Sequence, residues 1–154
     1  MKHILLICLI STLTSFGTAQ EMTGGEMTGG DTTGGAADAA ILQVAEDALG
    51  QFLVAEDGMT LYLFTSDSEN TSTCYDGCAA NWPPLLTDGE PSLGEGVDEA
   101  LLGTAERTDG TTQVTYGGWP LYFFTSDQSA GDTSGQGVGG VWYVVSPEGE
   151  AVGN

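Results

Sequence analysis

The sequence predicts an all-β protein in which two tandem repeats form one compact sandwich or small barrel. Two observations carry this prediction. The seven residues at 61–67 return at 121–127 with six positions identical, which indicates that one supersecondary unit is used twice. Short runs of β-branched and aromatic residues also alternate with glycine-containing turns along the same part of the chain, a pattern typical of strands and hairpins.

The repeat extends well beyond this seven-residue segment. At a constant offset of 60 residues and without a gap, residues 41–82 and 101–142 are identical at 15 of 42 positions. The tyrosines Tyr62 and Tyr122 are matched in this alignment, and so are Trp82 and Trp142. We therefore expect each pair to occupy equivalent places, related by an approximate two-fold axis or a repeat rotation.

Each copy is expected to contain three strands in a meander, a long loop and a segment that carries the tryptophan. Asp109-Gly110 separates two strand-like runs, which is typical of a tight hairpin turn. Residues 141–145 are β-branched or aromatic throughout and predict a strand covered on both faces. Pro83 and Pro84 place the matching segment of the first copy at an edge or in a loop, because proline cannot donate to a central ladder.

The residues before the repeats predict export. Residues 1–19 have the features of a secretory signal peptide: Lys2 and His3, a seven-residue apolar run at 4–10, and small residues before Gln20. The apolar run is far shorter than the roughly 20 residues that a membrane-spanning helix needs. Residues 20–40 hold three Gly/Thr-rich pentads, and we expect a disordered leader there. The two-repeat β domain then occupies 41–154, outside the cytoplasm, either secreted or periplasmic.

Composition restricts the classes of function. Beyond residue 19 the chain has one basic residue, Arg107, against 22 acidic ones, a formal charge of −21, and no histidine. Nucleic acid and anionic membranes are excluded as partners because binding either requires cationic groups. The usual proton shuttle and amine nucleophile are missing, so we expect no enzymatic activity, no catalytic residue and no cofactor. We expect a monomer with an envelope or extracellular partner of unknown identity.

Cys74 and Cys78 are the cysteines that remain after removal of the signal peptide. An isolated pair in an exported chain favours a structural disulfide, which stabilises by only about 2 kcal/mol because the loop is short. The matching positions of the second copy are Ser134 and Val138, so the fold can form without this bond. The alternative is a thiol or copper redox site in an electron-transfer accessory protein of the envelope.

A second group of candidate residues forms the repeated Tyr-x-aromatic-x-x-Asp motif. Its members are Tyr62, Phe64 and Asp67 in the first copy and Tyr122, Phe124 and Asp127 in the second. The structural interpretation is that each aspartate caps an Asx-turn and each tyrosine packs its ring with the hydroxyl at the rim. The alternative is a pair of equivalent ligand-binding sites. Asp127 and Asp132 are also candidate calcium ligands, but no EF-hand pattern surrounds them, and we assign no metal site.

These motifs together resemble the bacterial secreted-repeat lipoprotein family of unknown function, which is defined by the repeated Tyr-x-aromatic-x-x-Asp motif. Residues 74–85 resemble its first repeat, and residues 117–122, 131–137 and 141–145 resemble its second. The resemblance covers about residues 41–150 and implies export without an agreed activity. Many members carry a lipidated cysteine at the mature N-terminus, whereas Cys8 lies too early in the apolar run. We therefore expect an exported, non-enzymatic binding or structural module of the cell envelope.

Overall fold

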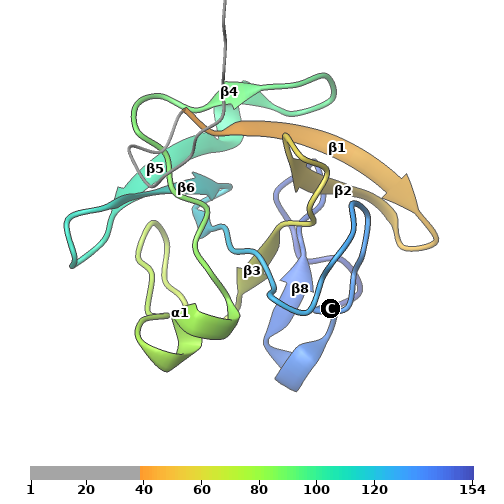
Figure 1. Ribbon diagram of the computed structural model, residues 1–154. Helices are drawn as coiled ribbons and strands as arrows, with labels where there is room; N and C mark the ends of the chain where they lie inside the picture. Colours follow the sequence, from red (N-terminus) through yellow and green to blue (C-terminus); the bar gives the residue numbers. More distant parts are fainter. Residues whose placement is uncertain (1–38) are drawn as a thin grey trace, which may run out of the picture. The chain divides into compact units, whose positions relative to one another are not determined.

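The computed structural model describes residues 39–154. The expected signal peptide at 1–19 and the expected leader up to residue 38 lie outside the described residues. The described part contains eight short strands, one α-helix and two 3-10 turns, and Figure 1 shows how they are arranged. The all-β class predicted from the sequence is confirmed.

The first repeat begins with a hairpin. Strands β1 (Ile41–Asp47) and β2 (Gly50–Ala55) pair in antiparallel register from Leu42 with Ala55 to Asp47 with Gly50. Strand β3 (Tyr62–Phe64) and helix α1 (Gly77–Asn81) follow. Strand β4 (Ser92–Leu93), in the connection between the repeats, adds to the outer edge of β1 in parallel orientation. The order of this sheet is therefore β2-β1-β4.

The second repeat begins with the same hairpin. The 3-10 turn η1 (Glu99–Leu101) leads into β5 (Leu102–Glu106), which pairs with β6 (Thr112–Tyr116), and β6 pairs with β7 (Trp119–Pro120). The predicted turn at Asp109-Gly110 joins β5 to β6, and Gly110 has a φ of 88°, which glycine adopts without the penalty of a side chain. The turn η2 (Val138–Gly140) and strand β8 (Trp142–Val144) complete the copy.

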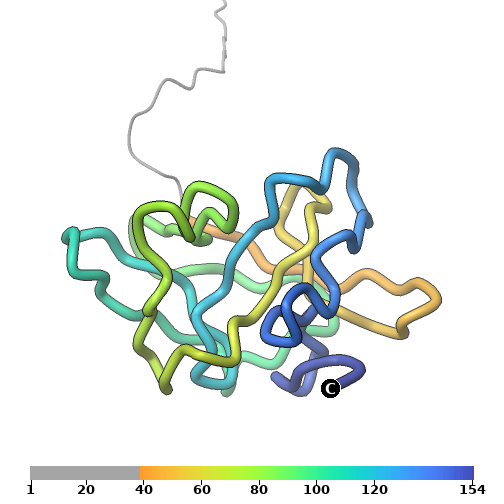
Figure 2. Tube along the Cα trace, turned by 90° about the horizontal axis from the view of Figure 1, so that it is seen from below, coloured from red at the N-terminus to blue at the C-terminus, as the bar shows by residue number. Residues whose placement is uncertain are grey.

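Each repeat pairs its motif segment with the last segment of the other repeat. Strand β3 of the first repeat pairs with β8 of the second, with Tyr62 opposite Val144. At the matching place Tyr122 forms a bridge with Pro84 of the first repeat. In the middle, Tyr62 and Tyr122 exchange main-chain hydrogen bonds of 2.9 and 3.0 Å, and Figure 2 shows the two segments side by side. Reciprocal contacts of this kind define a local two-fold axis, as the constant offset predicts.

The sheets of the described part stay open, which fits a sandwich and not the small barrel that was the other prediction. The reason lies in the exchanged segments, which join the hairpins through short pairings and single bridges. Pro84 illustrates this. The ladder there uses the Leu85 N–H, which donates to Leu121 O, and the Pro83 carbonyl, which accepts from Phe123 N–H, so neither proline is needed as a donor.

Two clusters of buried side chains fill the interior. One lies among the hairpins and includes Leu42, Leu53, Val114 and Tyr116. The other surrounds the two-fold axis, and its largest members are Phe52, Tyr62, Tyr122, Trp82 and Trp142. Residues 39–154 contain no helix with the length and apolar character needed to cross a membrane. The axis cluster collects the motif residues of both repeats and is the starting point for the candidate site.

Candidate functional site

Each motif tyrosine bonds to the aspartate of the opposite repeat. The Tyr62 hydroxyl donates to Asp127 Oδ2 at 2.7 Å, and the Tyr122 hydroxyl donates to Asp67 Oδ2 at 2.6 Å. Both tyrosines are fully buried, and Asp67 and Asp127 are only 7% and 6% exposed. The prediction that the hydroxyls lie at the rim is wrong, because the central pairing of the two strands directs both rings into the interior.

The second carboxylate oxygen of each aspartate holds the loop that follows its own strand. Asp67 Oδ1 accepts from the main-chain N–H and the hydroxyl of Thr73, both at 2.7 Å. Asp127 Oδ1 accepts from the main-chain N–H of Ser134 at 2.9 Å. The predicted Asx-turn is therefore wrong in detail, since the donors lie six and seven residues further along the chain. Each aspartate links its own loop to the tyrosine of the other repeat.

The environment of the two tyrosines favours the protonated phenol. Burial raises the pKa of Tyr62 and of Tyr122 far above the ordinary tyrosine value, and donation to a carboxylate raises it further. The Gly135 N–H bond to Tyr62 and the Ser72 bond to Tyr122 act in the opposite direction and do not reverse it. Both phenols therefore remain hydrogen-bond donors over the physiological range.

Four aromatic rings are stacked through the axis cluster. Trp82 and Trp142 lie face to face with centroids 3.8 Å apart and planes 1° from parallel. Phe124 covers the outer face of Trp82 at 4.0 Å, and Phe64 covers Trp142 at 4.3 Å. Each such pair adds about 0.5–1.5 kcal/mol beyond the burial of its surface. The predicted equivalence of Trp82 and Trp142 is confirmed by these matched contacts.

Gly135 closes one end of this cluster. Its N–H donates to the Tyr62 hydroxyl at 3.1 Å. A Cβ at this position would lie 2.7 Å from the ring of Trp82 and 2.8 Å from the ring of Tyr62, so no side chain fits. The matching position in the first repeat is Tyr75, which points elsewhere and receives the guanidinium of Arg107 at 4.2 Å from its ring centroid. The two halves therefore differ around the same symmetric centre.

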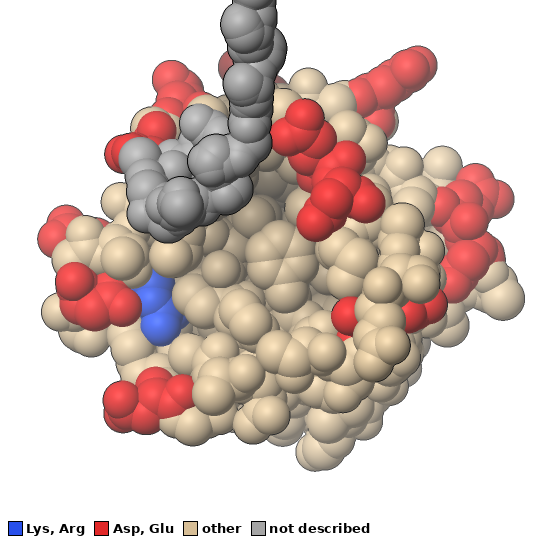
Figure 3. All heavy atoms as spheres, in the orientation of Figure 1, with Lys and Arg blue, Asp and Glu red and all other residues tan. Residues whose placement is uncertain are grey.

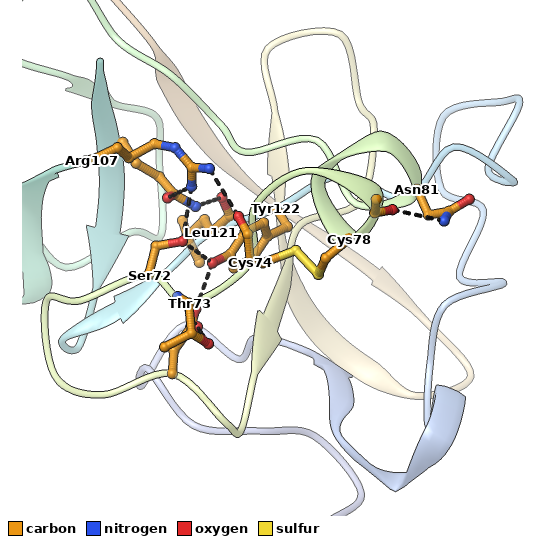
Figure 4. Close-up of a disulfide and its surroundings, with 11 residues drawn as sticks. Ser72, Thr73, Cys74, Cys78, Asn81, Arg107, Leu121 and Tyr122 are labelled. Atoms are coloured by element: carbon orange, nitrogen blue, oxygen red, sulfur yellow. Dashed lines mark hydrogen bonds between the residues drawn. A yellow bond between two sulfur atoms is a disulfide. The ribbon is translucent and has the colours of Figure 1, made fainter. Parts of the chain in front are cut away.

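Arg107 is buried, and its guanidinium points toward the segment that carries Ser72 and Cys74 (Figure 4). Its side chain is 2% exposed. Nη1 donates to Ser72 Oγ at 2.8 Å and to Gln113 Oε1 at 2.7 Å, and Nη2 donates to the Cys74 carbonyl at 2.9 Å. The nearest carboxylate, Asp109, is 3.9 Å from Nε and exposed. The partners of this buried cation are therefore mainly neutral oxygens and the ring of Tyr75.

A chain of hydroxyls joins this cation to a motif carboxylate. Ser72 Oγ lies 2.6 Å from the Tyr122 hydroxyl, and it already accepts from Arg107. The Tyr122 hydrogen points to Asp67, so the Ser72 hydrogen is free to point to Tyr122. Sequence reasoning missed this network, although a single arginine among so many acids was a signal that it is held for a structural reason.

The structure joins Cys74 and Cys78 in a disulfide, with Cα atoms 5.2 Å apart. Cys74 is fully buried, and Cys78 lies at the start of helix α1. The bond closes residues 74–78. Cys74 accepts from Arg107 through its carbonyl, and the two residues just before it, Ser72 and Thr73, contact Tyr122 and Asp67. The bond therefore lies beside the candidate site and helps to hold the loop in place.

The carboxylates considered as calcium ligands already accept hydrogen bonds from protein donors. Asp132 Oδ2 accepts from the main-chain N–H groups of Gln128 and Ser129 at 2.9 and 3.0 Å, and both oxygens of Asp127 are engaged as described above. Over residues 39–154 the structure has no group of three acidic, cysteine or histidine side chains placed to share a metal ion.

Comparison with known proteins places this chain in a family. No curated protein and no solved structure matches it. A family model described as a secreted repeat of unknown function matches it twice, over residues 43–86 and 103–146. Each match covers one structural repeat with its motif strand and tryptophan segment, which confirms the resemblance drawn from the motifs. The two matches together span more than half of the sequence, and the chain therefore belongs to the family of secreted repeats of unknown function.

Proposed function

We propose that this protein is an exported, non-enzymatic module of the cell envelope that acts by binding a partner or by supporting envelope structure. The observation that carries the proposal is the exchanged bonding of Tyr62 with Asp127 and of Tyr122 with Asp67. These bonds use the polar atoms of the family motif to hold two repeats together. The polar atoms of the motif therefore have a structural role in the interior. Other molecules would be bound by residues on the surface.

The surface charge supports a partner that is neither nucleic acid nor an anionic membrane. Arg107 is the only lysine or arginine in residues 39–154, and it is buried. Acidic side chains are spread over the face shown in Figure 3. A surface of one sign repels phosphate-rich partners and other copies of the same chain, so we propose a monomer that binds an envelope or extracellular protein.

The state of Cys74 and Cys78 separates this proposal from the redox alternative. Cys74 is buried and its carbonyl anchors Arg107, which supports a bond that is kept rather than cycled. Protein purified from its native compartment should contain no free thiol by titration and no stoichiometric copper by elemental analysis. Two reactive thiols, or one copper per chain, would instead support a thiol or copper redox protein.

Export is tested on the same sample. We expect mass spectrometry to find a mature chain that begins at or near Gln20 and carries no lipid. An intact Met1, or an acylated cysteine, would contradict this part of the proposal. Crosslinking in living cells then separates the two forms of the module: a binding module gives a discrete adduct with one protein, and a structural module gives adducts with the bulk envelope material.

A further inference from the structure

Strand β5 has one unpaired edge in the described part of the chain. It is the terminal strand of the sheet β5-β6-β7. The bonds from Arg107 N–H to Thr111 O and from Gly117 N–H to Leu101 O fix which residues face β6. Hydrogen-bonded and non-bonded pairs alternate in an antiparallel ladder. The main-chain groups of Leu102, Thr104 and Glu106 therefore point away from β6.

The matching edge of the first repeat is occupied. On β1, the Ser92 N–H donates to Ala40 O at 2.7 Å and the Gly94 N–H donates to Leu42 O at 2.6 Å, so that β4 adds in parallel. Leu102 is the counterpart of Leu42 at the constant offset. The counterparts of β4 are residues 152–153, and they lie elsewhere, since Val152 N–H donates to Val144 O. No main-chain donor of residues 39–154 reaches the Leu102 carbonyl.

The surroundings of this edge have space and negative charge. A hollow of about 370 Å³ lies between residues 89–91 and residues 102–104. Glu90 lines this hollow, Glu106 ends the strand, and Glu69 lines a second hollow beside residues 100–104; all three are exposed. Since two copies of the chain would bring these acids against each other, the charge opposes pairing of the edge with itself and favours a cationic partner.

We propose that the free edge of β5 binds an extended, lysine- or arginine-containing peptide segment of another exported protein, which adds to the sheet in parallel as β4 adds to β1. The Leu102 carbonyl and the main-chain groups of Thr104 and Glu106 supply the hydrogen bonds, and the acids around the edge select for basic side chains. The inference rests on the proposed binding function, and it names the binding surface and the chemistry of the partner.

The first test measures amide exchange by NMR in the mature protein, residues 20–154. The probe is a synthetic peptide with the β4 sequence Pro-Ser-Leu-Gly flanked by two lysines at each end. At saturation the Thr104 and Glu106 amides should exchange at least about tenfold more slowly. The Ala105 amide, which faces β6, is the internal control and should not change. If Thr104 is already protected in the free protein, its edge is occupied by this chain or by a second copy, and the proposal is wrong.

The second test compares peptides and variants by fluorescence anisotropy. A peptide flanked by glutamates should bind at least about tenfold more weakly than the lysine peptide. Thr104→Pro removes the edge donor without removing a bond to β6 and should abolish binding, whereas Thr104→Ala keeps the donor and should bind normally. Equal affinity for both peptides, or for both variants, overturns the proposal.

If Thr104→Pro does not fold, the exchange experiment on the unmodified protein decides alone. Absence of binding by the lysine peptide also overturns this inference. It leaves the proposed function to the thiol, copper and crosslinking measurements, which use no peptide, so the two failures are distinguishable.

Discussion

Tyr122→Phe removes one buried hydroxyl and keeps the ring that packs edge-on against Trp142. That hydroxyl donates to Asp67 at 2.6 Å and lies 2.6 Å from Ser72 Oγ. A hydrogen bond to a charged group contributes about 1.5–3 kcal/mol and a neutral one about 1 kcal/mol. We therefore expect the free energy of unfolding to fall by about 3 kcal/mol, and the midpoint of thermal unfolding by about 12 °C for a domain of this size.

The assay is urea unfolding followed by tryptophan fluorescence and circular dichroism. Tyr143→Phe is the matched control, because its hydroxyl donates to Gly140 O at 3.2 Å in an exposed position and should contribute less than about 0.5 kcal/mol. A double-mutant cycle with Asp67→Ala should give a coupling energy of at least about 1.5 kcal/mol. If Tyr122→Phe costs no more than the control, or if the coupling is near zero, the argument for the exchanged pairs fails.

Three further predictions concern pH, packing and the disulfide. In the folded state the pKa of both motif tyrosines is raised above the ordinary value of 10.0. The free energy of unfolding should therefore be constant below about pH 10 and fall above it by about 1.4 kcal/mol per pH unit for each tyrosine. Urea midpoints that stay constant up to about pH 11 would contradict this. Gly135→Ala should cost about 1–3 kcal/mol because its Cβ meets two rings, whereas Gly77→Ala has open space and should not destabilise; thermal melts that give equal effects would count against the packing argument. Cys74→Ala with Cys78→Ala should lose about 2 kcal/mol and keep the near-ultraviolet spectrum; an unfolded double variant would mean that the bond holds more than its own loop.

The sequence predicted the local hairpins and missed the exchange of partners. The turn at Asp109-Gly110 and the alternation of residues 113–116 are local signals, and they give β5 and β6 directly. The pairing of β3 with β8 has no such local signal. The motif segments 61–67 and 121–127 are identical at six of seven positions. Pairing within a copy and pairing between copies are therefore chemically alike there, and no residue pattern distinguishes them. Only the three-dimensional arrangement of the connections decides, and this explains why sandwich and barrel both remained open.

The candidate site was predicted as a set of residues but not as a network. The motif identified Tyr62, Asp67, Tyr122 and Asp127, because repetition alone picks them out. The direction of their side chains depends on the exchange, and the rim prediction was wrong for that reason. Arg107 shows a second limit. The sequence shows that it is the one basic residue after residue 19. Its burial depends on oxygens of Ser72 and Cys74 in the first repeat and of Gln113 in the second hairpin, which lie far apart in the sequence.

The exchange of strands makes this chain the covalent equivalent of a two-fold dimer. A single copy would leave its residues 62–64 without the partner that the other copy supplies, and it would depend on meeting a second molecule to fold. Joining the copies removes that dependence on concentration. It also allows each half to change alone: the disulfide is present only in the first repeat, and the buried arginine only in the second. The symmetric centre is constrained by both halves at once, so divergence among such fused pairs should accumulate at their flanks.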